Sequence, residues 1–320
     1  MIITVIMIWD LLDKGEDKMV IQTVDGAICE DRLGKTYIHE HLKIDLSKHK
    51  GSDDTNFNDL EAVIEEMKTL KSKGVNSIVE VTNRGMGQDI AAMQKVSRQC
   101  QLNIIASTGF YKEPYLPDYF YTMTEKELAK LLVKDILEGI DKTGVKAHVI
   151  GEVGTGKENI SDEEAKIFGI AIAAHLETGR PISTHTTLGN LALQQLKILS
   201  DSQVDLQKVV IGHLDLNCDK DYHLRVADSG CYMAFDTIGK TSYQLDGKRA
   251  EHIKILIDRG HVNQIMLSQD ITRKSHLQSR GGIGYNYLMD TFVPMLREVG
   301  VRETEIDQML IDNPKRFLAI

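Results

Sequence analysis

Two histidines, His39 and His41, are separated by one residue in the stretch KTYIHEHLKID at residues 35–45. The apolar residues around them favour an extended strand, because they fit no helical period. Successive side chains of a strand alternate between its two faces, so both imidazoles point to one side and Glu40 points to the other. Two imidazoles on one face can clamp a metal ion, although a lone His-x-His pair also occurs as a structural or surface accident. The rest of the chain must distinguish the two readings.

The elements that would position these histidines repeat along the chain: a short apolar segment is followed by a longer amphipathic helix. Eight segments have the pattern of strands, at residues 36–41, 76–82, 103–108, 147–153, 181–186, 209–213, 231–236 and 264–270. Eight alternating units over nearly the whole chain predict a single (β/α)8 TIM barrel. The rival fold, an open doubly wound sheet, would need a glycine-rich phosphate turn after an early strand, and the sequence has none.

Side chains that can bind metal ions stand at the C-terminal ends of five of the predicted strands. In such barrels the active site lies at these strand ends. The side chains are those of His39 and His41, Glu152, His185, His213 and Asp270. A single strand-end aspartate commonly caps a helix, but that reading does not account for five strand ends at once. Six mixed ligands exceed the three protein ligands of a catalytic zinc ion. They suit two divalent ions that share a carboxylate and a water.

Two divalent ions per chain are therefore the expected cofactor. Zinc is favoured and Mn, Fe or Co stay open, because nitrogen and oxygen ligands select weakly among them. Such a pair lowers the pKa of a bridging water toward about 7 and polarises the substrate's carbonyl or phosphoryl oxygen. We expect hydrolysis by attack of the metal-bridging hydroxide, with Asp270 both binding one ion and accepting the proton as the catalytic base.

The composition restricts the partners and the compartment. The chain has 320 residues and a formal net charge of −9, which disfavours general binding to nucleic acid or to an anionic membrane. Four scattered cysteines without a CxxC pair indicate neither a zinc knuckle nor a disulfide framework, and they fit a reducing cytoplasm. A small molecule is the expected partner, and a homodimer is the default assembly.

The first residues have a different character from the rest. Residues 1–18 open with an apolar run that Asp10 interrupts, too short to span a bilayer and poorly built as a signal peptide. Met19 begins a segment that predicts a small hairpin leading into the histidine strand. We therefore expect an N-terminal extension at 1–18 and a hydrolase barrel at 19–320.

Motifs at the strand ends resemble the phosphotriesterase-like family of the amidohydrolase superfamily, and most closely its phosphotriesterase homology proteins. The matching stretches are HEHLKIDLS (39–47), VEVTNRGMG (79–87), ASTGFY (106–111), IGEVGT (150–155), TGRPISTHT (178–186), IGHLDL (211–216), FDTIGK (235–240), MLSQDITR (266–273) and NPKRFL (313–318). The resemblance implies that the more buried ion is bound by His39, His41 and Asp270. It also implies that His185 and His213 bind the more exposed ion and that residue 152 bridges the two.

The chain departs from the family pattern in two places. The family usually bridges its metals with a carbamylated lysine, whereas Glu152 supplies a carboxylate without modification, so metal loading is expected not to need bicarbonate. The family also extends the proton path through a further histidine and aspartate. The segment DTIGK after the seventh strand has Asp236 but no histidine, so we expect Asp270 to pass its proton to solvent directly.

The loops after the third, seventh and eighth strands are expected to shape the substrate pocket. Candidate substrate-binding residues on these loops are Tyr111, Lys240, Arg273 and Lys274. Taken singly, such cations are usually solvated loop charges, but together at a metal site on an acidic protein they indicate an anionic substrate. We expect a carboxylic ester or lactone, specifically a phosphorylated sugar lactone whose phosphate is held by Lys240 and Arg273.

Other functions remain open at this point. One is phosphotriesterase activity. A second is a TatD-like metal-dependent nuclease, which shares the ligand pattern but is opposed by the acidic charge and by the stretches ISTHT and MLSQDITR. A third is a non-catalytic binding protein on the same fold, which the presence of all six ligands opposes. His148 shares the face of Glu152 but lies deeper in the barrel, so we expect a hydrogen-bonded core histidine there.

Overall fold

The computed structural model describes residues 19–319. The extension expected at residues 1–18 lies outside the described residues, so the division of the chain at Met19 stays a prediction. Within residues 19–319, no helix is both long enough and apolar enough to cross a membrane.

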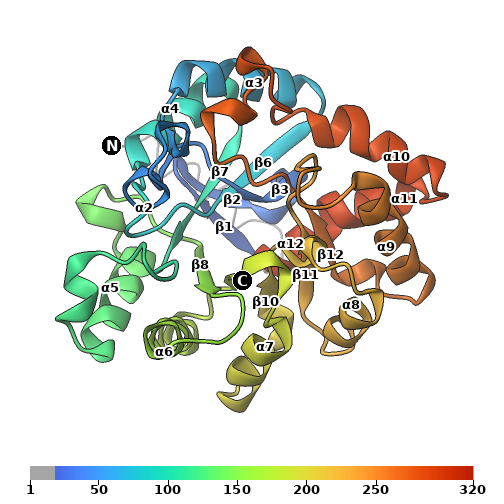
Figure 1. The fold of residues 1–320 in the computed structure, drawn as a ribbon. Coiled ribbons are helices and arrows are strands. Elements are labelled where there is room, and N and C mark those ends of the chain that lie inside the picture. Colours follow the sequence, from blue (N-terminus) through green and yellow to red (C-terminus); the bar gives the residue numbers. More distant parts are fainter. Residues whose placement is uncertain (1–18, 320) are drawn as a thin grey trace, which may run out of the picture.

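Eight parallel strands form one curled sheet with helices around it, and this confirms the predicted (β/α)8 barrel (Figure 1). The strands are β3 (Lys35–Glu40), β6 (Val75–Glu80), β7 (Asn103–Thr108), β8 (Val149–Thr155), β9 (Ile182–Thr186), β10 (Val209–Ile211), β11 (Tyr232–Phe235) and β12 (Ile265–Leu267). Each of them overlaps a predicted segment. Their order in the sheet follows the chain from β3 to β12, so every strand end faces the same rim.

The two outermost strands of this sheet, β3 and β12, are joined through the side chain of Glu40. Its Oε1 accepts hydrogen bonds from Gln269 N at 2.7 Å and from Ser268 Oγ at 2.8 Å, and its Oε2 accepts one from Ile271 N at 3.0 Å. Glu40 points away from the two histidines that flank it, as strand alternation predicts. A buried carboxylate therefore closes the barrel next to the residue that ends β12.

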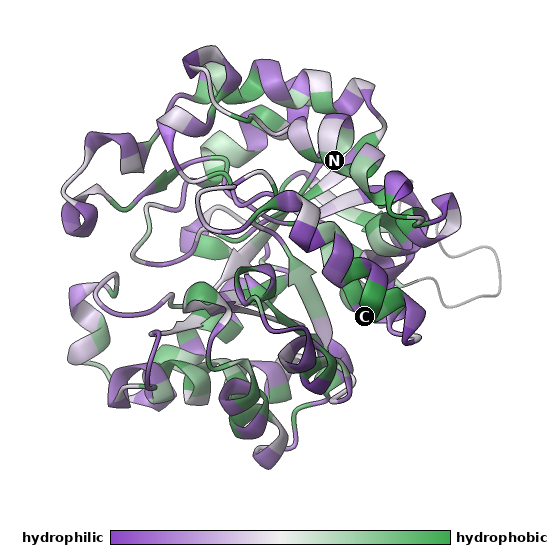
Figure 2. Cartoon of the chain, turned by 45° about the vertical axis from the view of Figure 1, so that its right-hand side comes forward, coloured by the Kyte–Doolittle hydropathy of each residue, from purple (hydrophilic) through white to green (hydrophobic). Residues whose placement is uncertain are grey.

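Amphipathic helices cover the outside of the sheet. They are α3 (Leu60–Ser72), α4 (Ile90–Cys100), α5 (Glu125–Leu137), α6 (Asp162–Thr178), α7 (Ala192–Asp201), α8 (Lys220–Ala227), α9 (Asp246–Asp258), α10 (Val293–Glu298), α11 (Glu303–Asp307) and α12 (Asn313–Leu318). Hydrophobic and hydrophilic residues alternate along them (Figure 2), as one core-facing side per helix requires. A capping box at Thr124 begins α5 and another at Ser161 begins α6.

A hairpin of β1 (Val20–Thr23) and β2 (Gly26–Cys29) covers the N-terminal end of the barrel, as predicted before the histidine strand. Val24 N donates to Ile104 O at 2.9 Å, which attaches the hairpin to β7. His148 lies at this end, fully buried, and its Nε2 donates to Leu318 O at 2.7 Å. It is the hydrogen-bonded core histidine that we expected. Apolar side chains fill this end of the barrel, and the predicted metal ligands lie toward the opposite rim.

Candidate metal centre and its pocket

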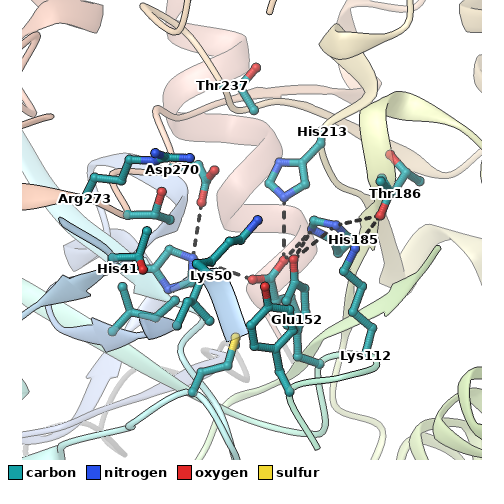
Figure 3. Close-up of a pocket in the computed structure, with 18 of the residues that line it drawn as sticks. His41, Lys50, Lys112, Glu152, His185, Thr186, His213, Thr237, Asp270 and Arg273 are labelled. Carbon is teal, nitrogen blue, oxygen red and sulfur yellow. Dashed lines mark hydrogen bonds and ion pairs between the residues drawn. The ribbon is translucent and has the colours of Figure 1, made fainter. Parts of the chain in front are cut away.

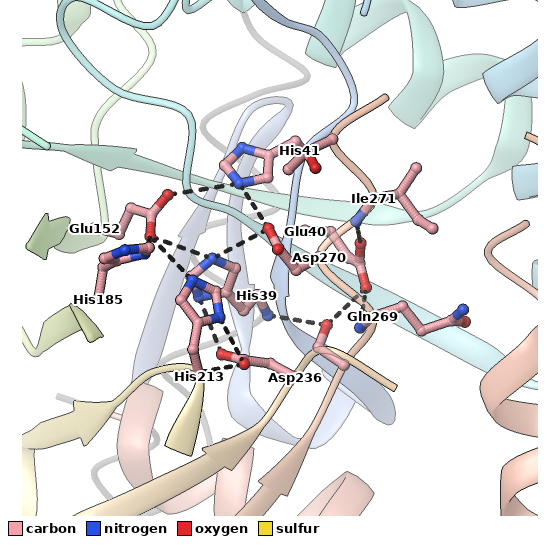
Figure 4. Close-up of polar contacts among 12 residues, drawn as sticks. His39, Glu40, His41, Glu152, His185, His213, Asp236, Gln269, Asp270 and Ile271 are labelled. Carbon is pink, nitrogen blue, oxygen red and sulfur yellow. Dashed lines mark hydrogen bonds and ion pairs between the residues drawn. The ribbon is translucent and has the colours of Figure 1, made fainter. Parts of the chain in front are cut away.

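The structure brings together all six residues predicted as metal ligands, with Glu152 at their centre; Figure 3 labels all of them except His39, which Figure 4 adds. Its Oε2 lies 3.5 Å from His39 Nε2, and its Oε1 lies 3.6 Å from His41 Nε2. Oε2 also lies 3.1 Å from His185 Nδ1 and 3.6 Å from His213 Nε2. One carboxylate from β8 therefore lies between a histidine pair on β3 and a second pair from β9 and the end of β10. This is the arrangement that a bridging ligand needs.

Asp270 completes the group from the end of β12 (Figure 4). Its Oδ1 lies 3.2 Å from His41 Nε2 and 3.8 Å from His39 Nε2, while its Oδ2 accepts a hydrogen bond from Lys240 Nζ. Asp270 and His213 have positive φ angles of 52° and 56°. Such left-handed backbone is strained for residues other than glycine and gathers at functional sites.

The ring nitrogens of His39 show that these residues fit metal ions. His39 is 1% exposed, and neither of its ring nitrogens has a hydrogen-bond partner of acceptable geometry. Buried polar atoms ordinarily have such partners. One group of ligand atoms within 4.8 Å of each other joins His39, His41 and Glu152, and another joins Glu152, His185 and His213. Two overlapping groups that share one carboxylate suit a pair of divalent ions.

Asp236, at the end of β11, orients the imidazole of His213 and lies next to that of His39. Its Oδ1 accepts from His213 Nδ1 at 2.8 Å and from His213 N at 2.9 Å, and its Oδ2 lies 3.4 Å from His39 Nδ1. On the other side, Thr82 Oγ1 lies 2.7 Å from His41 Nδ1. Outer groups of this kind fix the ring nitrogen that faces a metal. Sequence reasoning missed both residues in this role, although Asp236 directly follows β11 and Thr82 lies just beyond β6.

The electrostatics keep both carboxylates ionised, the form that binds cations. Burial alone would raise the pKa of Glu152, but the electrostatic interaction with His39, the hydrogen bond from His185 and the nearby His213 hold it well below its usual value. Burial also opposes ionisation of Asp270, but the Lys240 ammonium, a hydrogen bond from His41 and the nearby His213 and His39 together hold the pKa of Asp270 well below the usual value. Burial lowers the pKa of His185 to about 3, so its imidazole is neutral and free to bind a cation.

A cavity of about 340 Å³ opens onto this group. Three of the four predicted substrate-binding residues line it: Tyr111, Lys240 and Arg273. Tyr111 Oη lies 3.2 Å from His185 Nε2, and the two rings meet edge to face. Arg273 is half-buried, and its nearest carboxylate oxygen, Asp54 Oδ2, is 4.0 Å away.

The structure corrects the expectations for the two loop lysines. Lys274 does not line the cavity, because its Nζ pairs with Asp53 Oδ2 at 2.8 Å, and we remove it from the substrate-binding set. Lys240 does line the cavity, but its ammonium is bound by Asp270 and is not a free phosphate anchor. Two cations that the sequence reasoning missed, Lys50 and Lys112, also line the cavity. For Lys112 a signal was available, since it directly follows Tyr111.

Comparisons with known proteins agree with this geometry. The chain matches the phosphotriesterase family over residues 19–318. It is 44% identical over 287 residues to a phosphotriesterase homology protein from Escherichia coli (strain K12), and the alignment covers 90% of this chain and 98% of that protein. A crystal structure of the E. coli protein, complexed with phosphate in its active site, superimposes with a TM-score of 0.88 over 90% of this chain and 99% of that one.

Two further relatives are named for different activities. An N-acetyltaurine hydrolase from Dictyostelium discoideum is 32% identical over 362 residues, which cover 94% of this chain and 98% of that protein. The crystal structure of a lactonase from Listeria monocytogenes is 28% identical, with a TM-score of 0.89 over 94% of this chain and 99% of the lactonase chain. The similarity therefore extends over hydrolases of more than one substrate class.

Proposed function

The chain belongs to the phosphotriesterase family and is a metal-dependent hydrolase, and from this premise we propose that it cleaves a small carboxylic ester or lactone that carries an anionic group. A phosphorylated sugar lactone is the specific candidate. The observation that carries the proposal is the lining of the cavity above Glu152, which includes Lys50, Lys112, Lys240 and Arg273. Asp270 binds Lys240, but Lys50, Lys112 and Arg273 are not bound by a carboxylate of the centre, and these three cations favour an anionic substrate. The lactonase among the structural relatives supports the ester or lactone class.

In the proposed reaction two divalent ions would be held by His39, His41, His185, His213, Glu152 and Asp270. When bound, such ions supply an acidified water and polarise the acyl oxygen. Asp270 accepts the proton of the attacking water at Oδ1, while Lys240 Nζ holds Oδ2 and so fixes the orientation of the carboxylate. Tyr111 packs edge-on against His185 and forms the wall of the cavity beside it.

A second candidate is hydrolysis of an N-acylated amine that carries a sulfonate. The observation that favours it is the 32% identity, over 94% of the chain, to an N-acetyltaurine hydrolase. N-acetyltaurine combines an amide with a sulfonate, and the cations of the cavity suit a sulfonate as well as they suit a phosphate. By contrast, phosphotriesterase activity is disfavoured, because a neutral triester has no charge for these cations to bind.

Metal analysis and a substrate panel test the proposal. We expect close to two divalent ions per chain, and loss of both the ions and the activity in His39→Ala but not in the control His261→Gln, whose imidazole contacts Gln264 outside the site. The panel compares phosphorylated and plain lactones, N-acetyltaurine and a neutral phosphotriester. An active preparation without metal, or faster hydrolysis of the phosphotriester than of every acyl compound, would refute the proposal.

A further inference from the structure

The His185 side of the cavity carries a cation, Lys112, to which the proposed reaction assigns no specific contact with the substrate. Lys112 follows Tyr111 in the loop after β7, and its Nζ donates a hydrogen bond to Thr187 Oγ1. Thr187 Oγ1 in turn lies 3.3 Å from His185 Nε2. The Lys112 ammonium is therefore separated from a candidate metal ligand by a single hydroxyl group.

Among residues 19–319, no carboxylate lies within ion-pair distance of Lys112. Other lysines on the loops around the rim are paired: Lys240 with Asp270 and Lys274 with Asp53. A lysine that is partly buried ordinarily has such a partner. The charge of Lys112 is thus available to a ligand in the cavity.

The groups around Lys112 also favour an anion. Lys50, the last residue of α2 (Ser47–Lys50), lines the same cavity and has no ion-pair partner within the described part of the chain. Burial lowers the pKa of Lys112; the more distant carboxylates of Glu152 and Glu164 oppose this effect, and the charge of Lys50 adds to it. Two ammonium groups that repel each other are stabilised when an anion binds near both. Glu113, the next residue, is not within ion-pair distance of Lys112, and its carboxylate accepts a hydrogen bond from Ser161 Oγ at 2.9 Å.

We propose that Lys112, assisted by Lys50, binds a sulfonate or phosphate-ester group at one end of the substrate and so selects anionic over neutral acyl compounds (Figure 3). The inference rests on the proposed function in one respect, namely that the scissile acyl group lies next to Glu152. Because Thr187 contacts both Lys112 and His185, only a short spacer fits between the anionic group and the scissile bond. The selected substrates are therefore small.

A binding experiment tests the anion site without any turnover. Ethanesulfonate and ethyl phosphate are titrated calorimetrically into the metal-loaded wild type, Lys112→Met and Lys48→Met. Lys48 is the matched control, because it is exposed on the same short helix as Lys50 and does not line the cavity. We expect Lys112→Met to raise the Kd of the tighter probe by about 10- to 150-fold, the loss of one charged hydrogen bond. Lys48→Met should leave the Kd unchanged.

The outcomes separate the two proposals. The probe that binds the wild type more tightly identifies the group as a sulfonate or a phosphate ester. Equal Kd values for wild type and Lys112→Met with both probes, or binding of neither probe, would overturn the anion site. The same titrations are made with Lys112→Gln, and the melting temperatures of the variants are measured. These controls show whether the methionine disturbs the loop.

Kinetics then link the site to selectivity. The ratio of kcat/KM for a sulfonate-bearing acyl compound to that of its neutral analogue should fall in Lys112→Met, mainly through KM, and recover in part in Lys112→Arg. An unchanged ratio in an active enzyme contradicts the role of Lys112. Intact anion binding without turnover of any acyl compound contradicts the proposed function and leaves the anion site standing.

Discussion

Protonation of His148 should destabilise the barrel, and the structure shows why. The neutral ring accepts at Nδ1 from Arg180 Nη1 at 2.7 Å and from Gln22 N at 3.1 Å, and it donates from Nε2 to Leu318 O. A second proton on Nδ1 would face both of these donors. Burial and the Arg180 charge accordingly lower the pKa of His148 to about 3. Its hydrogen bonds join the hairpin, the barrel and the C-terminal helix.

The size of the effect follows from linkage between protonation and folding. An unfolded chain keeps the ordinary histidine pKa of about 6.5, so at about pH 5 the unfolded chain is protonated at His148 and the folded chain is not. Stability contributed by the neutral ring is fully present above about pH 6.5 and is lost as the pH falls toward about 3. Between about pH 7.5 and pH 5, the free energy of unfolding should fall by about 2 kcal/mol through this one group.

The assay is urea unfolding of metal-free wild type and His148→Gln at both pH values. Other buried histidines titrate in both proteins, and their contributions cancel in the comparison. Wild type should therefore lose about 2 kcal/mol more than the variant between the two pH values. If the two proteins lose the same stability, the assignment of His148 as a neutral acceptor is wrong.

Three further predictions concern the candidate site. Glu152→Gln keeps the size of the side chain but removes its charge, so metal content and turnover should fall together; full activity would exclude Glu152 as the bridge. Asp270→Asn should lower kcat by at least about 10²-fold, and a wild-type kcat with both metals bound would assign the proton to another group. Asp236→Asn weakens the contacts that orient His213 and His39, so the affinity for metal, measured by chelator competition, should fall by about 10- to 100-fold. An unchanged affinity would show that Asp236 does not position these ligands.

The sequence by itself determined the barrel and the side chains at its rim. Strand alternation and helical periodicity are local properties, so they could be read without knowing which segments pack together. The faces of His39 and His41, opposite to that of Glu40, follow from the same period of two. Once eight parallel strands are recognised, the convergence of Glu152 and Asp270 with the histidines follows from topology.

Only the tertiary structure decided which charges are paired and which are free. Asp236 reaches His39 from β11 across the barrel to β3, and Lys240 meets Asp270 across two loops. Contacts of this kind depend on the path of each loop in space, which no local period encodes. The same holds for the loop cations: Lys274 finds Asp53, more than two hundred positions away, whereas Lys112 finds no carboxylate among the described residues. The charge that a substrate meets is therefore a property of the folded loops.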